Sequence, residues 1–185
     1  MSTLLIAAAL IAAIAGIFLL LISINKQQKR HAMNIFLNRL SQAGTSNNLS
    51  FSSQELLNNS AIGLDGLRRQ LLVLTRFGNG DYFNFTIDLD KVQCCSVKKV
   101  YGFINAGELK NSKLERHLEE IILHIVLYQS DSVDIPFYSH IENHIEQAND
   151  LEHKAKQWEI MLTKLLNERF KKAGSEKSAT QPGIS

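Results

Sequence analysis

The feature that most constrains this chain is an uncharged apolar run near its N-terminus. Residues 4–24 contain no charged side chain and only Ser23 as a polar one. As a helix, these 21 residues would extend about 31 Å at about 1.5 Å per residue, which matches the hydrocarbon core of a bilayer. We therefore predict a transmembrane anchor over residues 1–25.

A cleaved signal peptide is the competing interpretation, because Ala13-Ile14-Ala15 resembles a small-residue cleavage site. Two features favour the anchor: no basic side chain precedes the run, and the run continues well past that site. Lys26, Lys29 and Arg30 follow immediately, so the positive-inside rule places the C-terminal bulk in the cytoplasm. We expect a single-pass protein of the cell (inner) membrane with its C-terminal domain in the cytoplasm.

The rest of the chain divides into four segments. Apolar positions at helical spacing predict a juxtamembrane helix over residues 26–43. A stretch rich in Ser and Asn predicts a linker over residues 44–60. The globular domain is expected over residues 61–170, and the small polar residues that follow predict a disordered tail over residues 171–185.

Turn residues and alternating apolar residues predict antiparallel strands in the domain. Asp65-Gly66 is a hairpin signal between two apolar runs, and the glycines and asparagine of FGNGD mark a second turn. Alternate residues from Phe83 to Leu89 are apolar, which is the period of a half-buried strand. Further strands are expected over about 92–101, 118–128 and 133–138.

The best periodic signal after the anchor lies near the C-terminus. Apolar residues recur at intervals of three and four from Ile141 to Leu165, around the single Trp158. They predict a long amphipathic helix from about His140 to Arg169, with Ser139 and Glu142 at capping-box spacing. The expected fold class is α+β: an N-terminal transmembrane helix, then an antiparallel β-sheet or half-barrel closed by the long C-terminal helix.

This order of elements resembles the pleckstrin-homology-like (PH-like) barrel. The residues that carry the resemblance are IGLDGLRRQLLVL, TIDLDKVQCCSVKK, IILHIVLYQSDSVDIPFYS and the helix with Trp158, which together cover roughly Ala61 to Arg169. The whole chain is similar to a group of short bacterial proteins that have one N-terminal membrane helix and such a domain. The resemblance implies the architecture and a membrane location, and it brings no activity.

The resemblance also draws attention to two pairs of basic residues. Pleckstrin-homology domains often bind phosphoinositides through basic residues around the first hairpin, and Arg68 and Arg69 follow that hairpin signal here. The sequence lacks an extended row of lysine and arginine, so two solvated arginines are the alternative interpretation. The same two interpretations, contact with phosphate groups or solvated side chains, apply to Lys98 and Lys99. Recognition of anionic lipid by these four residues is the second functional hypothesis.

Motifs for catalysis and nucleotide binding are absent from the sequence. There is no GxSxG, GxxxxGK[ST] or GxGxxG, and a turn explains the polar residues 130–132. His140 and His144 would share one helical face, but HIENH is not HExxH and no third ligand is specified, which favours solvent-facing histidines over a zinc site. We therefore expect that the protein is not an enzyme, that it binds no cofactor, and that it has no catalytic or metal site. The net charge of +2 and the lack of a basic tract argue against nucleic acid.

The two cysteines, Cys94 and Cys95, are adjacent. Neighbours in a strand point to opposite faces, so we predict one buried thiol and one on the other face. The CxxC spacing of redox and zinc motifs is missing.

The leading hypothesis is a membrane-tethered, non-enzymatic binding or scaffolding domain. Its partner would be a protein segment or another membrane protein. The expected contact surface is a strand edge near Pro136, which lacks a backbone donor and so marks an edge or a strand end. The residues assigned to this edge are Val133, Ile135, Pro136, Phe137 and Tyr138.

Overall fold

The computed structural model describes residues 27, 31, 33–78, 80–102, 117–129 and 131–178. A helix over residues 33–46 leads into the following elements: β1 (Ser53–Leu56), β2 (Ser60–Asp65), β3 (Gln70–Arg76), β4 (Tyr82–Asp88), η1 (Leu89–Lys91), β5 (Val92–Tyr101), β6 (Leu118–Leu127), β7 (Ser132–Ser139), η3 (Ile145–Gln147) and α2 (Ala148–Ser178). The fold is therefore α+β.

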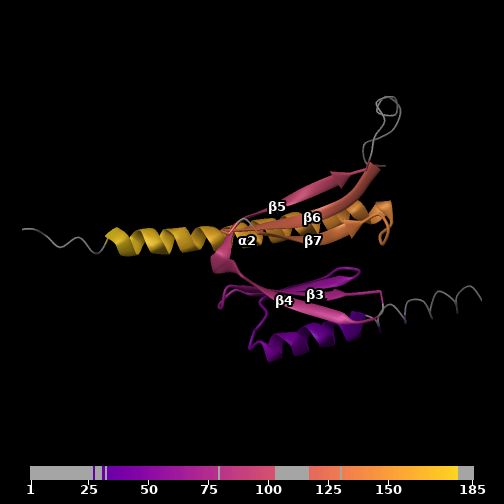
Figure 1. Cartoon of the computed structure of the whole chain (residues 1–185), viewed down its shortest axis with the longest axis horizontal. Helices are drawn as coiled ribbons and strands as arrows, with labels where there is room; N and C mark the ends of the chain where they lie inside the picture. Colours follow the sequence, from indigo (N-terminus) through magenta and orange to yellow (C-terminus); the bar gives the residue numbers. More distant parts are fainter. Residues whose placement is uncertain are drawn as a thin grey trace, which may run out of the picture.

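The strands form two antiparallel sheets. The first has the order β1-β2-β3-β4 and the second has the order β5-β6-β7. Figure 1 shows the sheets one above the other, with α2 running along the second sheet, and α2 packs against β5, β6 and β7. The predicted hairpins and the strands expected over 92–101, 118–128 and 133–138 are confirmed as β2 to β7.

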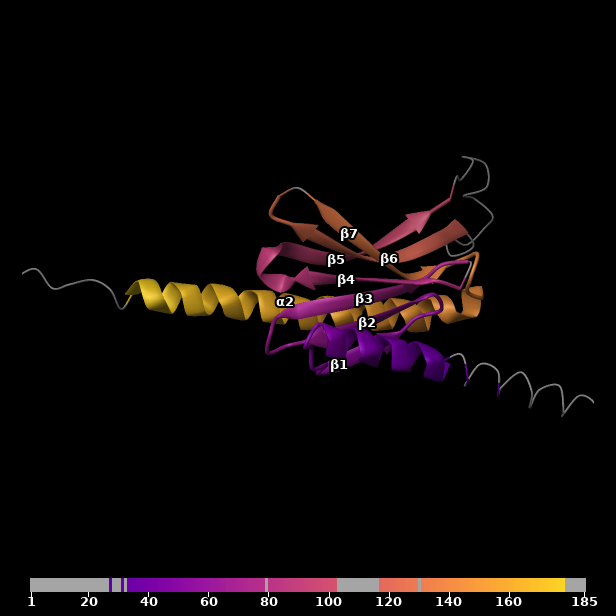
Figure 2. The ribbon, with the colours of Figure 1, turned by 60° about the horizontal axis from the view of Figure 1, so that its bottom comes forward.

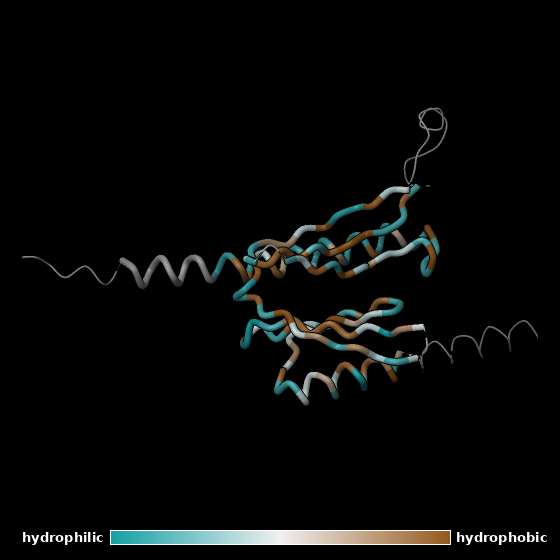
Figure 3. Tube along the Cα trace, in the orientation of Figure 1, coloured by the Kyte–Doolittle hydropathy of each residue, from teal (hydrophilic) through white to brown (hydrophobic). Residues whose placement is uncertain are grey.

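Apolar side chains form two cores, one on each face of the first sheet. The larger core fills the space between the two sheets and α2, and it includes Ile62, Leu71, Leu123, Phe137 and Trp158. The smaller core lies beneath the helix over residues 33–46, and it includes Phe36, Leu40, Leu49, Leu72 and Leu74. Because both faces of the first sheet are covered, all six residues of β2 are buried. Figure 3 shows the apolar stretches along the strands of both sheets.

Residues 44–60 are part of this fold, so the linker prediction was wrong. β1 pairs antiparallel with β2, and Leu49 and Leu57 are buried. The ring of Phe51 lies against Gly44 and Gly63, where an added Cβ would stand 2.6 and 2.7 Å from ring atoms. A few apolar residues therefore decide the conformation of a segment whose composition is that of a loop.

The C-terminal helix begins eight residues later than predicted, at Ala148 rather than near His140. Ser139 ends β7, and its carbonyl oxygen accepts the N–H groups of Glu142 at 3.0 Å and Asn143 at 2.8 Å, which closes a turn instead of capping a helix. At its other end α2 continues to Ser178. The backbone of residues 171–178 is thus helical where a disordered tail was predicted, and residues 179–185 lie outside the described residues.

The predicted anchor over residues 1–25 also lies outside the described residues. Among the residues that the structure does describe, no helix is long and apolar enough to cross a membrane. Gln27, His31 and residues 33–46 are helical, in the region where a juxtamembrane helix was predicted, and the helix ends three residues beyond the expected position.

Candidate functional site

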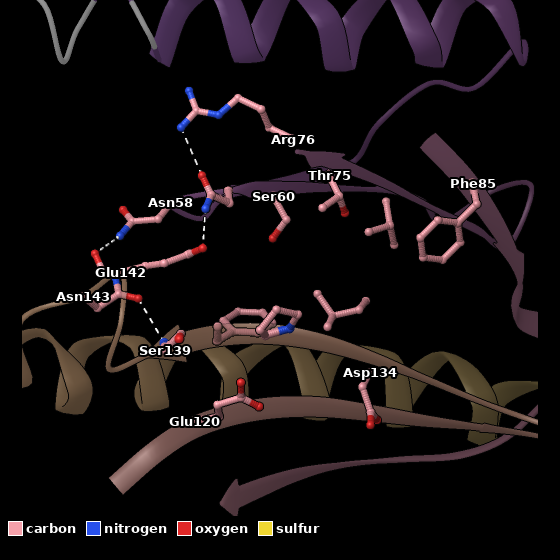
Figure 4. A pocket seen from close by; sticks show the side chains of 15 residues that line it. Asn58, Ser60, Thr75, Arg76, Phe85, Glu120, Asp134, Ser139, Glu142 and Asn143 are labelled. Atoms are coloured by element: carbon pink, nitrogen blue, oxygen red, sulfur yellow. Dashed lines mark hydrogen bonds between the residues drawn. The ribbon is translucent and has the colours of Figure 1, made fainter. Parts of the chain in front are cut away.

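A cleft of ≈ 260 Å³ lies between the two sheets. Val73 and Phe85 of the first sheet and Ile135 and Phe137 of β7 give it apolar walls. Figure 4 shows that the two sheets contribute opposite walls, with Phe85 and Asp134 far from the polar cluster at the other end. The cleft is therefore an open part of the space between the sheets, with apolar and polar side chains along its walls and a polar cluster at one end.

A series of hydrogen bonds joins the two sheets at the polar end of the cleft (Figure 4). Asn58 Nδ2 donates to the carbonyl oxygen of Glu142 at 2.8 Å, and Asn59 Nδ2 donates to the Glu142 carboxylate. Arg76 Nη2 donates to Asn59 Oδ1 at 3.0 Å. These bonds hold the turn between β1 and β2 against the turn that follows β7. The cleft is therefore bridged by hydrogen bonds at this end.

Among the strands that the structure describes, β7 forms one edge of the second sheet, and it borders the cleft. The Leu127 N–H donates to the Asp131 carbonyl at 2.8 Å, which fixes the register between β6 and β7. Because backbone groups of an antiparallel strand alternate in direction, Ser132, Asp134 and Pro136 turn theirs away from β6. The free edge offers N–H and C=O groups at Ser132 and Asp134, and only a C=O group at Pro136.

Most of the side chains predicted to form this edge point into the molecule. Pro136 is exposed and Val133 is half-buried, whereas Ile135, Phe137 and Tyr138 are 1–2 % exposed. Burial raises the pKa of the Tyr138 phenol. These three side chains belong to the core, where Ile135 and Phe137 also line the cleft. Contact with a partner at this edge therefore stays a prediction that depends on its backbone groups rather than on these side chains.

Arg69, predicted to contact lipid, is held by the fold. Its Nε donates to Asp90 Oδ1 at 2.8 Å and its Nη1 donates to the Leu165 carbonyl of α2 at 3.0 Å. The side chain is only 22 % exposed. Arg68, the preceding residue, is exposed.

The second predicted basic pair lies on β5 and contacts another part of α2. Lys99 Nζ lies 2.6 Å from Glu152 Oε2, and Lys98 is exposed. Glu152 and Leu165, which contact the two basic pairs, are 13 residues apart on α2, about 20 Å along the helix axis. Arg68, Arg69, Lys98 and Lys99 therefore do not form one anion site.

The histidines considered as metal ligands are in a turn rather than on a helix. His140 and His144 are both exposed between β7 and η3. His124 instead pairs across the sheet, with its Nδ1 2.5 Å from Asp134 Oδ1. In the part of the chain that the structure describes, no group of three His, Cys, Asp or Glu residues could hold a metal ion. Ser130 is outside that part.

The adjacent cysteines are both free thiols and differ in exposure, although the less exposed thiol is half-buried where a buried one was predicted. Cys94 is exposed, whereas Cys95 faces α2, with its Sγ 3.5 Å from Thr163 Oγ1 and 3.7 Å from the Glu159 carbonyl oxygen. Burial, and secondarily the nearby Glu159 carboxylate, raise the pKa of the Cys95 thiol, while the contact with Thr163 opposes this.

Sequence reasoning missed the polar end of the cleft. Asn58 and Asn59 were assigned to a linker and Glu142 to a helix cap. The available signal was the pair of adjacent asparagines just before the short apolar run of residues 61–64, since side-chain amides can hydrogen-bond to a distant turn.

Comparison with known proteins gave no match: no family model, no curated protein and no solved structure resembles the chain closely enough to be matched.

Proposed function

We propose that this chain is a membrane-tethered, non-enzymatic binding domain that faces the cytoplasm and holds an extended segment of a partner protein beside β7. The observation that carries this proposal is the free edge of β7 bordering the cleft. An extended segment can pair with such an edge through main-chain hydrogen bonds, while side chains that enter a neighbouring pocket give specificity.

The geometry limits what the partner segment can be. Main-chain pairing is available at Ser132 and Asp134, and it stops at Pro136 because proline has no N–H. Beside the same strand, the apolar walls formed by Phe85, Ile135 and Phe137 suit one or two apolar side chains. The partner segment is therefore short and extended, and it carries one or two apolar side chains.

The wider architecture supports the proposal. A four-stranded sheet, a three-stranded sheet and a C-terminal helix across them are the parts of a PH-like barrel, which we propose as the finer description of the fold. The membrane tether is proposed from the uncharged run over residues 4–24 and the basic residues that follow it.

The edge can be tested with a matched pair of substitutions in the full-length protein. Asp134→Pro removes the outward N–H group, whereas Asp134→Ala removes the same carboxylate and keeps that group. The protein is purified from detergent-solubilised membranes, and partners recovered at near-equal molar amounts are identified. We expect the same partner with the wild type and Asp134→Ala, and its loss with Asp134→Pro.

A second pair tests the cleft. Thr75 lines it, whereas Thr86 is exposed on β4 outside it. Thr75→Trp fills the cleft and should release the partner, and Thr86→Trp should not. Equal recovery with all four variants, or no stoichiometric partner for the wild type, would count against the proposal. Synthetic peptides that cover the recovered partner then show whether one extended segment binds directly.

A further inference from the structure

Exposed apolar side chains gather at one end of the domain. Eleven large hydrophobic residues are exposed among those described, and seven of them lie where several elements begin or end at this end: Met33; Phe77 and Phe83; Val100 and Tyr101; Ile141 and Ile145. We call this surface the apolar end. Phe77 is 54 % exposed beside the β3–β4 turn and Ile141 is 83 % exposed in the turn after β7.

Contacts show that these elements share one end. Met33 lines a hollow together with Asn58, Arg76 and Gln147, so the start of the N-terminal helix lies beside the ends of β3 and η3. The Lys99–Glu152 ion pair holds the end of β5 near the start of α2. Figures 1 and 2 show the helix over residues 33–46 beginning at the end where α2 also begins, and α2 finishing at the opposite end.

The chain also enters the domain at the apolar end. Ile24 closes the uncharged run and lies nine residues before Met33. Nine residues span about 14 Å as a helix and about 30 Å at most when extended. If residues 4–24 cross a bilayer, the apolar end lies within that distance of its hydrocarbon core.

We propose that the apolar end rests on the surface of the bilayer, with Phe77 and Ile141 inserted at the level of the lipid headgroups. The inference depends on the membrane anchoring of the proposed function and adds an orientation to it. Glu142 lies in the same turn as Ile141, and Glu146 follows in η3, so burial of apolar side chains, rather than attraction to anionic lipid, drives the contact. The contact therefore persists in zwitterionic lipid and at high salt.

Tryptophan fluorescence of the full-length protein in nanodiscs tests this orientation. Phe77→Trp and Ile141→Trp place a reporter at the apolar end, and Leu67→Trp is the control, because Leu67 is 95 % exposed at the opposite end. The native Trp158 is 3 % exposed and contributes the same background to every variant. Nanodiscs are prepared from phosphatidylcholine or from phosphatidylcholine brominated on its acyl chains, which quenches nearby indoles.

The expected result is a larger fractional loss of emission in brominated discs for the variants at 77 and 141 than for the variant at 67, unchanged by high salt. Equal losses at the three positions in protein that comigrates with the discs overturn the orientation and leave the anchor intact. Failure of the wild-type chain to comigrate with discs overturns the anchoring and this inference together. All three positions are exposed, and urea midpoints equal to that of the wild type verify that the variants are folded.

Discussion

The carboxylate of Asp65 accepts the backbone N–H of Ser50 at 2.8 Å, which joins the first hairpin to the segment before β1. The same carboxylate accepts the N–H groups of Leu67 at 3.0 Å and Arg68 at 2.9 Å. Asp65 is 2 % exposed. The N–H groups, that of Arg68 first, hold the pKa of this carboxyl below its ordinary value of 3.8.

Asp65→Asn should therefore destabilise the protein. One amide oxygen replaces two carboxylate oxygens, and a buried amide donor is left facing backbone N–H groups, at a cost of about 2 kcal/mol in the free energy of unfolding. Urea denaturation at neutral pH measures the loss. Asp131→Asn at an exposed turn position is the control and should change the unfolding free energy little.

The contribution of Asp65 should also depend on pH, with a definite sign. Because its pKa is lower in the folded state than in the unfolded chain, its stabilising effect is complete above the unfolded value of 3.8 and is lost as the pH falls through the folded value. The difference in unfolding free energy between wild type and Asp65→Asn should be constant near neutrality and shrink in acid. A difference that grows in acid would contradict this assignment.

Gly63→Ala should destabilise the packing of Phe51. An added Cβ at Gly63 would stand 2.7 Å from the ring, which must then move, at a cost of about 1–3 kcal/mol. Phe51→Leu shortens the side chain, so the double variant should lose less stability than the sum of the two single variants. Additive losses in a double-mutant cycle would show that the ring does not oppose the new methyl group.

Arg69→Ala should cost about 1–2 kcal/mol of unfolding free energy, because it removes the hydrogen bonds to Asp90 and to the Leu165 carbonyl. Arg69 has a φ of 55°, and alanine keeps a Cβ there, so backbone strain stays the same. Arg68→Ala at the neighbouring exposed position is the matched control and should have almost no effect. Equal thermal midpoints for the two variants would contradict a structural role for Arg69.

The two cysteines should differ in reactivity in the folded protein. Cys94 is exposed, whereas Cys95 is partly covered by α2 and its thiol has a raised pKa. Only the thiolate reacts readily with alkylating reagents. Iodoacetamide near neutral pH, followed by peptide mass spectrometry, should label Cys94 first, and urea should make both equally reactive. Preferential labelling of Cys95 in the native state would contradict the observed packing.

Local patterns predicted the strands well for a physical reason. Asp65-Gly66 and the FGNGD turn dictate where the chain reverses, and alternation along β4 places Phe85 and Ile87 toward the core. These signals involve only residues that are close in sequence, and the local turns and strands that they favour are also the ones found in the folded chain.

The start of α2 and the polar end of the cleft depend on distant residues. Glu142 has the spacing of a helix cap relative to Ser139. In the structure, however, its carbonyl oxygen and its carboxylate accept hydrogen bonds from Asn58 and Asn59, which lie more than eighty residues earlier. A spacing rule cannot include partners so far apart in sequence. In residues 44–60, Leu49 and Leu57 were visible in the sequence, yet composition outweighed them in the linker prediction.

The helix over residues 33–46 has a mechanical consequence. Phe36 and Leu40 are 5 % and 0 % exposed against the first sheet, and close-packed interiors yield little to small forces. The helix and the cleft therefore turn as one rigid body. A rotation of the helix about its own axis would turn the opening of the cleft through the same angle. The packing of Phe36 and Leu40 therefore fixes the direction in which the cleft opens relative to the helix, as well as the distance between the two.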